Sequence, residues 1–135
     1  MSLIEWTNDL SVNVKEIDLQ HQKLVEMIND LHAAMRDRKT KDSLKKIIDD
    51  LANYTASHFL TEEKYFDQFK YDKAFMHKKE HNDFVKKVME FKKGFDENRL
   101  LLSMDIMNFL KDWLTKHIKG SDKQYSPFFN EKGLF

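Results

Sequence analysis

The sequence has no cysteine, a single proline and three glycines, and its 23 basic residues are balanced by 23 acidic ones. Without cysteine the chain has no disulfide, thiolate nucleophile, iron–sulfur cluster or cysteine-bound zinc. Because glycine and proline mark tight turns, their scarcity argues against a sandwich or barrel and favours a few long elements. Zero net charge removes the bulk attraction to phosphate and anionic lipid, so we expect no nucleic-acid or membrane partner.

Long apolar stretches are also missing from the chain. No apolar run approaches the roughly 20 residues that cross a bilayer. The first residues include Glu5 and Asp9 where a signal peptide has an apolar segment, so no signal peptide is expected. A cysteine-free chain of this kind fits the cytoplasm, and its 135 residues suit a single domain over residues 1–135.

Apolar residues recur every three or four positions along four stretches, which is the spacing of helix faces that pack into a core. The pattern predicts helices over residues 18–37, 41–64, 71–93 and 103–119. The short connections between them make sequential helices antiparallel neighbours. The fold is therefore predicted to be all-α, an up-down-up-down four-helix bundle with an N-terminal arm and a short C-terminal tail.

Particular residues are predicted to begin and end these helices. Asp18 and Thr40 are candidate N-caps, and Gly94 and Gly120 are candidate C-terminal stops. Three phenylalanines of the tail are expected to cover one end of the bundle: Phe128, Phe129 and Phe135.

Ionisable side chains interrupt the inward-facing apolar stripes, where each would cost several kcal/mol unless something satisfies it. They are His21, His58, Glu62, His77, His81 and His117. Two pairs, His58 with Glu62 and His77 with His81, have the i, i+4 spacing that stacks side chains on one helix face. Neighbouring ligands of a metal ion need this separation.

The predicted topology brings the six residues to one end of the bundle, because the first and third helices begin where the second and fourth end. At 1.5 Å per residue they fall within a layer about 15 Å thick, which predicts a shared metal site. His32 lies about 16 Å further along the same face and is expected to be a core or rim residue. Asp122, five residues after His117, has the wrong spacing for one face of a continuous helix. A helix ending at Gly120 could turn it back, so Asp122 remains either a ligand or a surface acid.

Five imidazoles exceed what one ion in a bundle would take, and two carboxylates would complete two octahedral ions that share them. Imidazole with carboxylate suits iron, zinc or copper, while the absence of sulfur disfavours Cu(I) and structural zinc. The Glu-x-x-His motif of ferritin-like di-iron proteins is absent. A histidine-rich site also carries less negative charge than theirs, which favours the ferrous state and reversible chemistry.

In the order of its candidate ligands the chain resembles the hemerythrins, and specifically the single-domain bacteriohemerythrins. The matching pattern is His21, His58-x-x-x-Glu62, His77-x-x-x-His81 and His117-x-x-x-x-Asp122. Flanking residues match as well: Trp6-Thr7, Ile17-Asp18-x-Gln20-His21-Gln22, His58-Phe59 and Asp112-Trp113-Leu114-x-x-His117-Ile118-x-x-x-Asp122-x-x-Tyr125. The chain departs at Tyr71-Asp72, where family members often have a proline, and in the tail beyond Tyr125.

The resemblance implies two iron ions (Fe²⁺/Fe³⁺) joined by an oxo or hydroxo bridge. His77, His81 and His117 would hold one iron, His21 and His58 the other, and Glu62 and Asp122 would bridge them. O₂ would bind reversibly, as hydroperoxide, at the two-histidine iron. The implied apolar O₂ pocket comprises Leu24, Phe59, Trp113, Leu114 and Ile118. The implied function is an oxygen carrier, store or delivery protein and not an enzyme. Separately, the charged residues are too evenly spread to indicate a subunit interface, so we expect a monomer.

Other uses of the same residues remain open. A di-iron site could serve O₂ or redox sensing, iron handling, or reduction of peroxide or nitric oxide, with an unidentified partner or electron donor. His77, Glu80 and His81 also match H-x-x-E-H, the inverzincin metalloprotease signature. That reading leaves the other ligands unexplained, and an all-helical domain this short has little room for a substrate cleft. We therefore interpret Glu80 as a solvated helix residue.

Overall fold

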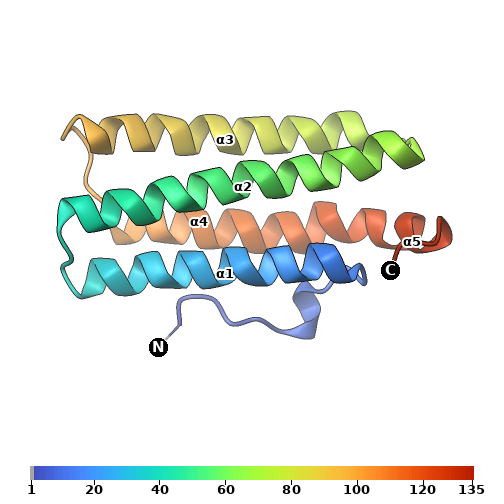
Figure 1. Ribbon diagram of the computed structural model, residues 1–135, viewed down its shortest axis with the longest axis horizontal. Helices are drawn as coiled ribbons and strands as arrows, with labels where there is room; N and C mark the ends of the chain where they lie inside the picture. The colour runs from blue at the N-terminus through green and yellow to red at the C-terminus, as the bar shows by residue number, and fades with distance from the viewer. Residues whose placement is uncertain (1) are drawn as a thin grey trace.

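The computed structural model describes residues 2–135, and its main feature is an antiparallel bundle of four long helices (Figure 1). These are α1 (Lys15–Arg36), α2 (Lys41–Phe69), α3 (Ala74–Asp96) and α4 (Met104–His117). Three shorter elements flank them: the 3₁₀ turn η1 (Asn8–Leu10), the π-helical turn η2 (Ile118–Asp122) and helix α5 (Lys123–Glu131). The predicted all-α up-down-up-down bundle is confirmed. The part of the chain described contains no helix both long and apolar enough to cross a membrane.

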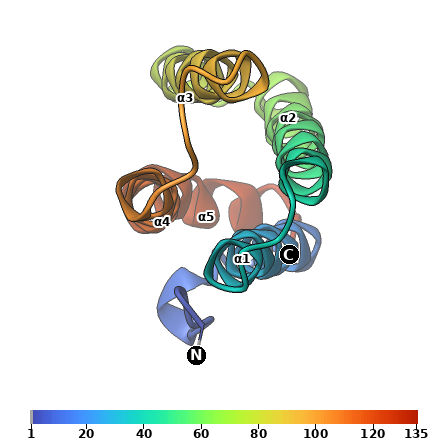
Figure 2. The same cartoon turned by 90° about the vertical axis from the view of Figure 1, so that its left-hand side faces the viewer.

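The four long helices surround a shared core (Figure 2). Helix α1 packs closely against α2, and α2 against α3, whereas α3 and α4 approach each other less closely. The start of α1, the end of α2, the start of α3 and the end of α4 lie at the same end of the bundle, beside α5 (Figure 1). This arrangement places residues from all four helices in one layer, as their positions in the sequence predicted.

Apolar side chains fill the bundle along its length. In α1 the buried face consists of residues three and four apart, such as Ile17, Leu24, Ile28 and Leu31. Aromatic rings close the end that carries α5, where Phe66, Tyr71, Tyr125 and Phe129 are buried together.

The C-terminal tail covers this end only in part. Phe129 is fully buried and Phe128 packs against the core, as expected. The expectation for Phe135 was wrong, because its side chain is 72% exposed.

The predicted helix starts were half right. Thr40 caps α2, and its side-chain oxygen accepts a hydrogen bond from the Ser43 amide at 3.2 Å. Asp18 does not cap α1, which begins three residues earlier at Lys15. Its carboxylate accepts hydrogen bonds from the Ser11 hydroxyl at 2.5 Å and the Val12 amide at 2.8 Å, so it holds the N-terminal arm instead.

The two predicted glycine stops were wrong for different reasons. Gly94 lies inside α3, and the left-handed residue after that helix is Asn98, with φ of 62°. A Cβ at Gly94 would lie 2.5 Å from Leu100 Cδ1, so the glycine leaves room for the returning chain. Gly120 lies in η2, where the chain stays helical and a Cβ would contact nothing.

Asp18 provides a test of how the arm contributes to stability. Asp18→Ala removes both hydrogen bonds to a charged acceptor, and it should lower the free energy of unfolding by about 2 kcal/mol. Asp30→Ala, on an exposed position of the same helix, is the matched control and should change it by less than about 0.5 kcal/mol. Urea unfolding followed by circular dichroism measures both. Equal stability of the two variants would contradict the role given to Asp18.

Candidate metal centre

The seven candidate ligands come together at one end of the bundle. Helix α1 supplies one, α2 and α3 two each, and α4 with η2 the remaining two. In chain order they are His21, His58, Glu62, His77, His81, His117 and Asp122, and all are buried. The metal-site layer predicted from topology is therefore present as a geometric cluster.

The π-helical turn η2 explains how Asp122 joins the cluster. In a π-helix the backbone hydrogen bonds run between residues five apart, so residues i and i+5 lie on the same face. His117 ends α4 and Asp122 ends η2, which is this separation. The helix does not stop at Gly120 as predicted; it widens for one turn and carries Asp122 beneath His117.

The cluster divides into two groups that share both carboxylates. One group contains His77, His81 and His117 with Glu62 and Asp122, and the other contains His21 and His58 with the same two acids. Within each group the potential ligand atoms lie within 4.8 Å of one another. The arrangement thus has room for two ions side by side, with three imidazoles on one side and two on the other.

Asp122 divides its two carboxylate oxygens between the groups. Oδ1 lies 2.8 Å from His77 Nε2 and 3.0 Å from His117 Nε2, while Oδ2 lies 3.1 Å from His21 Nε2. One oxygen therefore faces each group, as a bridging carboxylate requires.

Glu62 lies between the groups in a different manner. Its Oε1 is 3.2 Å from His58 Nε2 and 3.3 Å from His81 Nε2, so one oxygen faces both sides. Its other oxygen, Oε2, accepts a hydrogen bond from the buried Tyr125 hydroxyl. Sequence reasoning matched Tyr125 only as a flanking residue and missed this contact, because no spacing rule links positions 62 and 125.

Several polar atoms of the cluster are buried without a hydrogen-bond partner among residues 2–135. They are both ring nitrogens of His21, Nε2 of His81, Oε1 of Glu62 and both oxygens of Asp122. Even the 3.1 Å approach of His21 Nε2 to Asp122 lacks hydrogen-bond geometry. Native proteins leave few such groups unsatisfied. With imidazole–metal distances of about 2.1 Å, adjacent ligands of an octahedral ion lie about 3.0 Å apart, which matches the contacts above.

Comparison with known proteins also indicates a metal-binding domain. The family model for the Hemerythrin HHE cation binding domain matches residues 12–129. The chain belongs to the hemerythrin family. It is 33% identical to the bacteriohemerythrin of Stenotrophomonas maltophilia, over 93% of this chain and 81% of that protein. It is also 33% identical to the bacteriohemerythrin of Methylococcus capsulatus, over 94% and 97%. A wild-type hemerythrin crystal structure has a TM-score of 0.89 at 31% identity, over 93% and 97%.

Membership decides which metal the donor set holds. Hemerythrins are di-iron proteins, and the buried cluster has the nitrogen and oxygen donors that two iron ions need. Family and fold together support a di-iron, oxygen-binding protein.

Three of the candidate ligand histidines place their Nδ1 nitrogen within hydrogen-bond distance of a side-chain oxygen outside the cluster. His58 Nδ1 lies 2.7 Å from Gln20 Oε1, and His81 Nδ1 lies 2.9 Å from Glu63 Oε2. Such partners fix the tautomer and the orientation of a ligating imidazole. Gln20 and Glu63 were missed as site residues, although each is a chain neighbour of a ligand.

Glu80 is the third of these partners and corrects an earlier interpretation. Its Oε1 lies 3.0 Å from His117 Nδ1 and accepts a hydrogen bond from the Ser121 hydroxyl at 2.6 Å. The side chain is 44% exposed, so it is solvated on one side as expected, but it also orients a ligand histidine. Glu80 therefore orients His117, which is a different role from the general base that the H-x-x-E-H protease motif would require.

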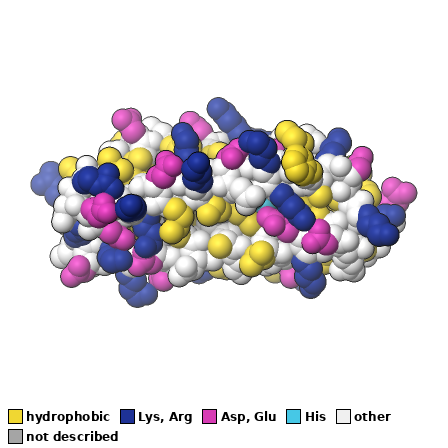
Figure 3. All heavy atoms as spheres, turned by 90° about the horizontal axis from the view of Figure 1, so that it is seen from above, with side chains coloured by type: hydrophobic (Ala, Val, Ile, Leu, Met, Phe, Trp, Pro, Cys, Tyr) yellow, Lys and Arg dark blue, Asp and Glu magenta, His cyan; other side chains and the backbone are white. Residues whose placement is uncertain are grey.

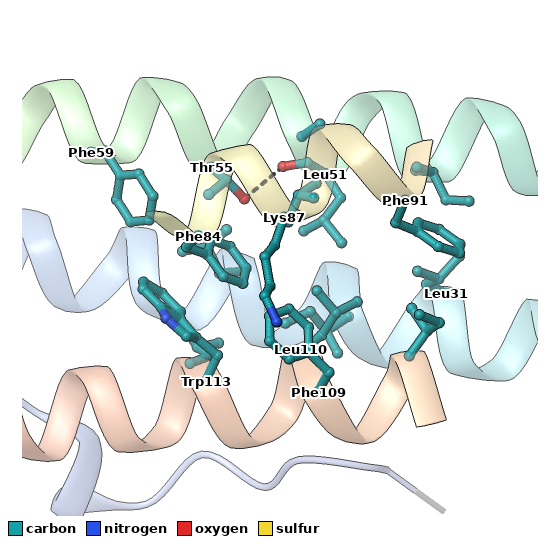
Figure 4. Close-up of a pocket in the computed structure, with 17 residues that line it drawn as sticks. Leu31, Leu51, Thr55, Phe59, Phe84, Lys87, Phe91, Phe109, Leu110 and Trp113 are labelled. Atoms are coloured by element: carbon teal, nitrogen blue, oxygen red, sulfur yellow. Dashed lines mark hydrogen bonds between the residues drawn. The ribbon is translucent and has the colours of Figure 1, made fainter. Parts of the chain in front are cut away.

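Aromatic rings pack directly on the candidate ligands. Phe59 stacks on His81 with ring centroids 3.8 Å apart, and Trp113 stacks on His117 at 4.3 Å. These two aromatic side chains also line an apolar cavity of about 280 Å³ inside the bundle (Figure 4). Of the five residues expected in an O₂ pocket, Leu24, Phe59, Trp113 and Leu114 line it. Ile118 is fully buried but does not line this cavity. His32 is half-buried and outside both donor groups, as expected.

The charges of the metal-free cluster compensate one another. Burial raises the pKa of each carboxyl, but the histidines outweigh it, so the pKa of Glu62 and that of Asp122 lie below their ordinary values. Burial likewise opposes a charge on His117, yet Asp122, Glu62 and Glu80 raise its pKa to about 9. The metal-free site therefore holds a proton at His117 that a metal ion must displace.

His117 gives the metal-free protein a defined pH dependence. Its folded pKa of about 9 exceeds the ordinary value of 6.5, so the stabilising proton is fully present below pH 6.5 and is lost as pH rises through 9. The free energy of unfolding should fall by up to about 3 kcal/mol over that window. Urea unfolding at pH 6.5 and 9.5 measures the change. His117→Gln should give a flatter profile, and an unchanged profile in that variant would refute the assignment.

Proposed function

We propose that this chain binds O₂ reversibly at a non-haem di-iron centre and serves as an oxygen carrier, store or delivery protein. The observation that carries the proposal is the unequal division of donors. The shared carboxylates Glu62 and Asp122 accompany three imidazoles on one side and two on the other. One ion therefore has one protein ligand fewer, which leaves it a position for an exchangeable molecule.

The proposed ligand assignment follows from the two groups. His77, His81 and His117 would hold one iron and His21 and His58 the second, with Glu62 and Asp122 shared. That gives five protein ligands to the first ion and four to the second. A shared oxo or hydroxo group would complete an octahedron at the first and leave one position open at the second.

When bound, an iron pair with a hydroxo bridge would supply the two electrons and the proton that reversible conversion of O₂ to hydroperoxide requires. The protein side chains support reversibility by keeping water and protons away. Leu24 follows His21 by three residues and Phe59 follows His58, so the apolar cavity borders the helices that carry the two-histidine group. Thr55, which also lines it, already donates its hydroxyl to the Leu51 carbonyl at 2.7 Å.

Tyr125 would steady the shared carboxylate. Its hydroxyl donates to Glu62 Oε2, and burial together with the nearby carboxylates raises its pKa well above the ordinary value. The phenol therefore stays neutral at physiological pH and keeps its proton in the hydrogen bond.

The mixed charges on the surface favour a protein that does not bind a large, highly charged partner. Basic and acidic side chains are interspersed over the face shown in Figure 3, with apolar groups between them. We propose a monomer with O₂ as its ligand and with neither nucleic acid nor membrane as a partner. Sensing, iron handling, and peroxide or nitric oxide reduction would use the same centre, but no feature described above favours them.

Single substitutions test the ligand assignment. His77→Ala should lower the iron content from two ions per chain, because it removes a donor from the three-imidazole group. His32→Ala is the matched control on a half-buried histidine outside the cluster, and it should retain both ions. Metal analysis after anaerobic reconstitution measures each. Loss of iron from the His32 variant would make the ligand assignment wrong.

Optical spectroscopy tests reversible binding. The protein is loaded anaerobically with ferrous iron, exposed to O₂ and then deoxygenated while its visible spectrum is recorded. A charge-transfer band that appears with O₂ and disappears on its removal is the expected result. A permanent change to a diferric spectrum would instead support redox chemistry, and the absence of any iron-dependent band would remove the di-iron proposal.

A further inference from the structure

The cavity of about 280 Å³ extends from the metal centre toward the opposite half of the bundle. Phe59 and Trp113 form its end nearest the candidate ligands, while Leu31 and Phe91 lie further along it (Figure 4). An apolar cavity of about 150 Å³ is enough to bind benzene. This one, in the same proportion, has room for roughly ten carbon atoms.

Residues of all four long helices line the cavity, and α3 and α4 are the neighbouring helices that approach each other least closely. Charged pairs join α2 to α3 in this half, with Lys92 3.1 Å from Asp49 and Lys45 3.6 Å from Asp96. Between α3 and α4, by contrast, the side chains that line the cavity are mainly apolar. They are Phe84, Val88 and Phe91 from α3, and Ile106, Phe109 and Trp113 from α4.

Lys87 is the charged side chain on the cavity wall. It extends from α3 toward α4, and its ammonium lies 5.4 Å from the centre of the Phe109 ring (Figure 4). It is the one lysine among the residues that line the cavity, and within residues 2–135 it has no carboxylate partner. Other lysines of α3, such as Lys79 and Lys92, are paired with aspartates. An unpaired cation beside an apolar cavity is complementary to a ligand with one anionic head and an apolar body.

We propose that this cavity is a binding site for a medium-chain fatty acid, whose carboxylate pairs with Lys87 and whose alkyl chain enters between α3 and α4. The volume sets the length of the chain at roughly ten carbons or fewer. The inner end of the bound chain would contact Phe59 and Trp113, the two side chains that stack on His81 and His117. The site needs no iron, so its test is independent of the proposed oxygen binding.

Calorimetric titration of the metal-free full chain with octanoate tests the proposal. Octanoate should bind saturably with one site per chain, and more tightly than hexanoate by roughly fifteenfold, since each buried methylene adds roughly fourfold. Lys87→Gln should weaken octanoate binding roughly fivefold, the worth of an accessible ion pair, and should leave binding of neutral 1-octanol unchanged. Both Lys87 and the control residue Lys86 are exposed, so both variants should fold.

Lys86→Gln removes the same charge one residue away, from a side chain outside the cavity lining, and should change neither affinity. If both substitutions weakened octanoate binding equally, the effect would be one of general surface charge and the proposed site would be wrong. Binding that is insensitive to Lys87, binding that does not depend on chain length, or the absence of saturable binding would overturn it as well.

Discussion

The rest of the structure depends on seven ionisable side chains that are buried together at one end of the bundle, where several of their polar atoms have no hydrogen-bond partner among residues 2–135 and are free to bind shared metal ions. Any one of them alone would cost several kcal/mol in an apolar core. Together they place carboxylate oxygens 2.8–3.3 Å from imidazole nitrogens, and an outer layer of Gln20, Glu63 and Glu80 supports three of the rings. Helix order, the π turn and the aromatic packing all serve to keep these groups in one layer.

Sequence alone predicted much of this arrangement. Helical spacing identified the four helices, and the i, i+4 pairs His58–Glu62 and His77–His81 stood out because charged groups on an apolar stripe need partners. Antiparallel topology then placed them at one end. These inferences succeeded because they rest on periodicity, which is a local property of the chain, and on connection length.

The errors fell where a tertiary contact decides. Asp18 was predicted to cap a helix, but its carboxylate accepts a hydrogen bond from a backbone amide of the N-terminal arm. Gly120 was predicted to end the fourth helix, whereas the chain continues there as a π-helical turn that no local sequence pattern indicates. Glu80 looked solvated, and only the fold brings it to His117, 37 residues away. The cavity and its unpaired Lys87 likewise depend on how far apart α3 and α4 settle.

The span of the cluster along the chain has a consequence for unfolding. His21 and Asp122 are separated by about a hundred residues, so ions held between them would close a loop through almost the whole chain, as a long-range disulfide does. A protein without cysteine would thereby gain a removable cross-link. Its resistance to heat and proteolysis would follow metal supply, because an ion that binds only the folded chain stabilises it by mass action.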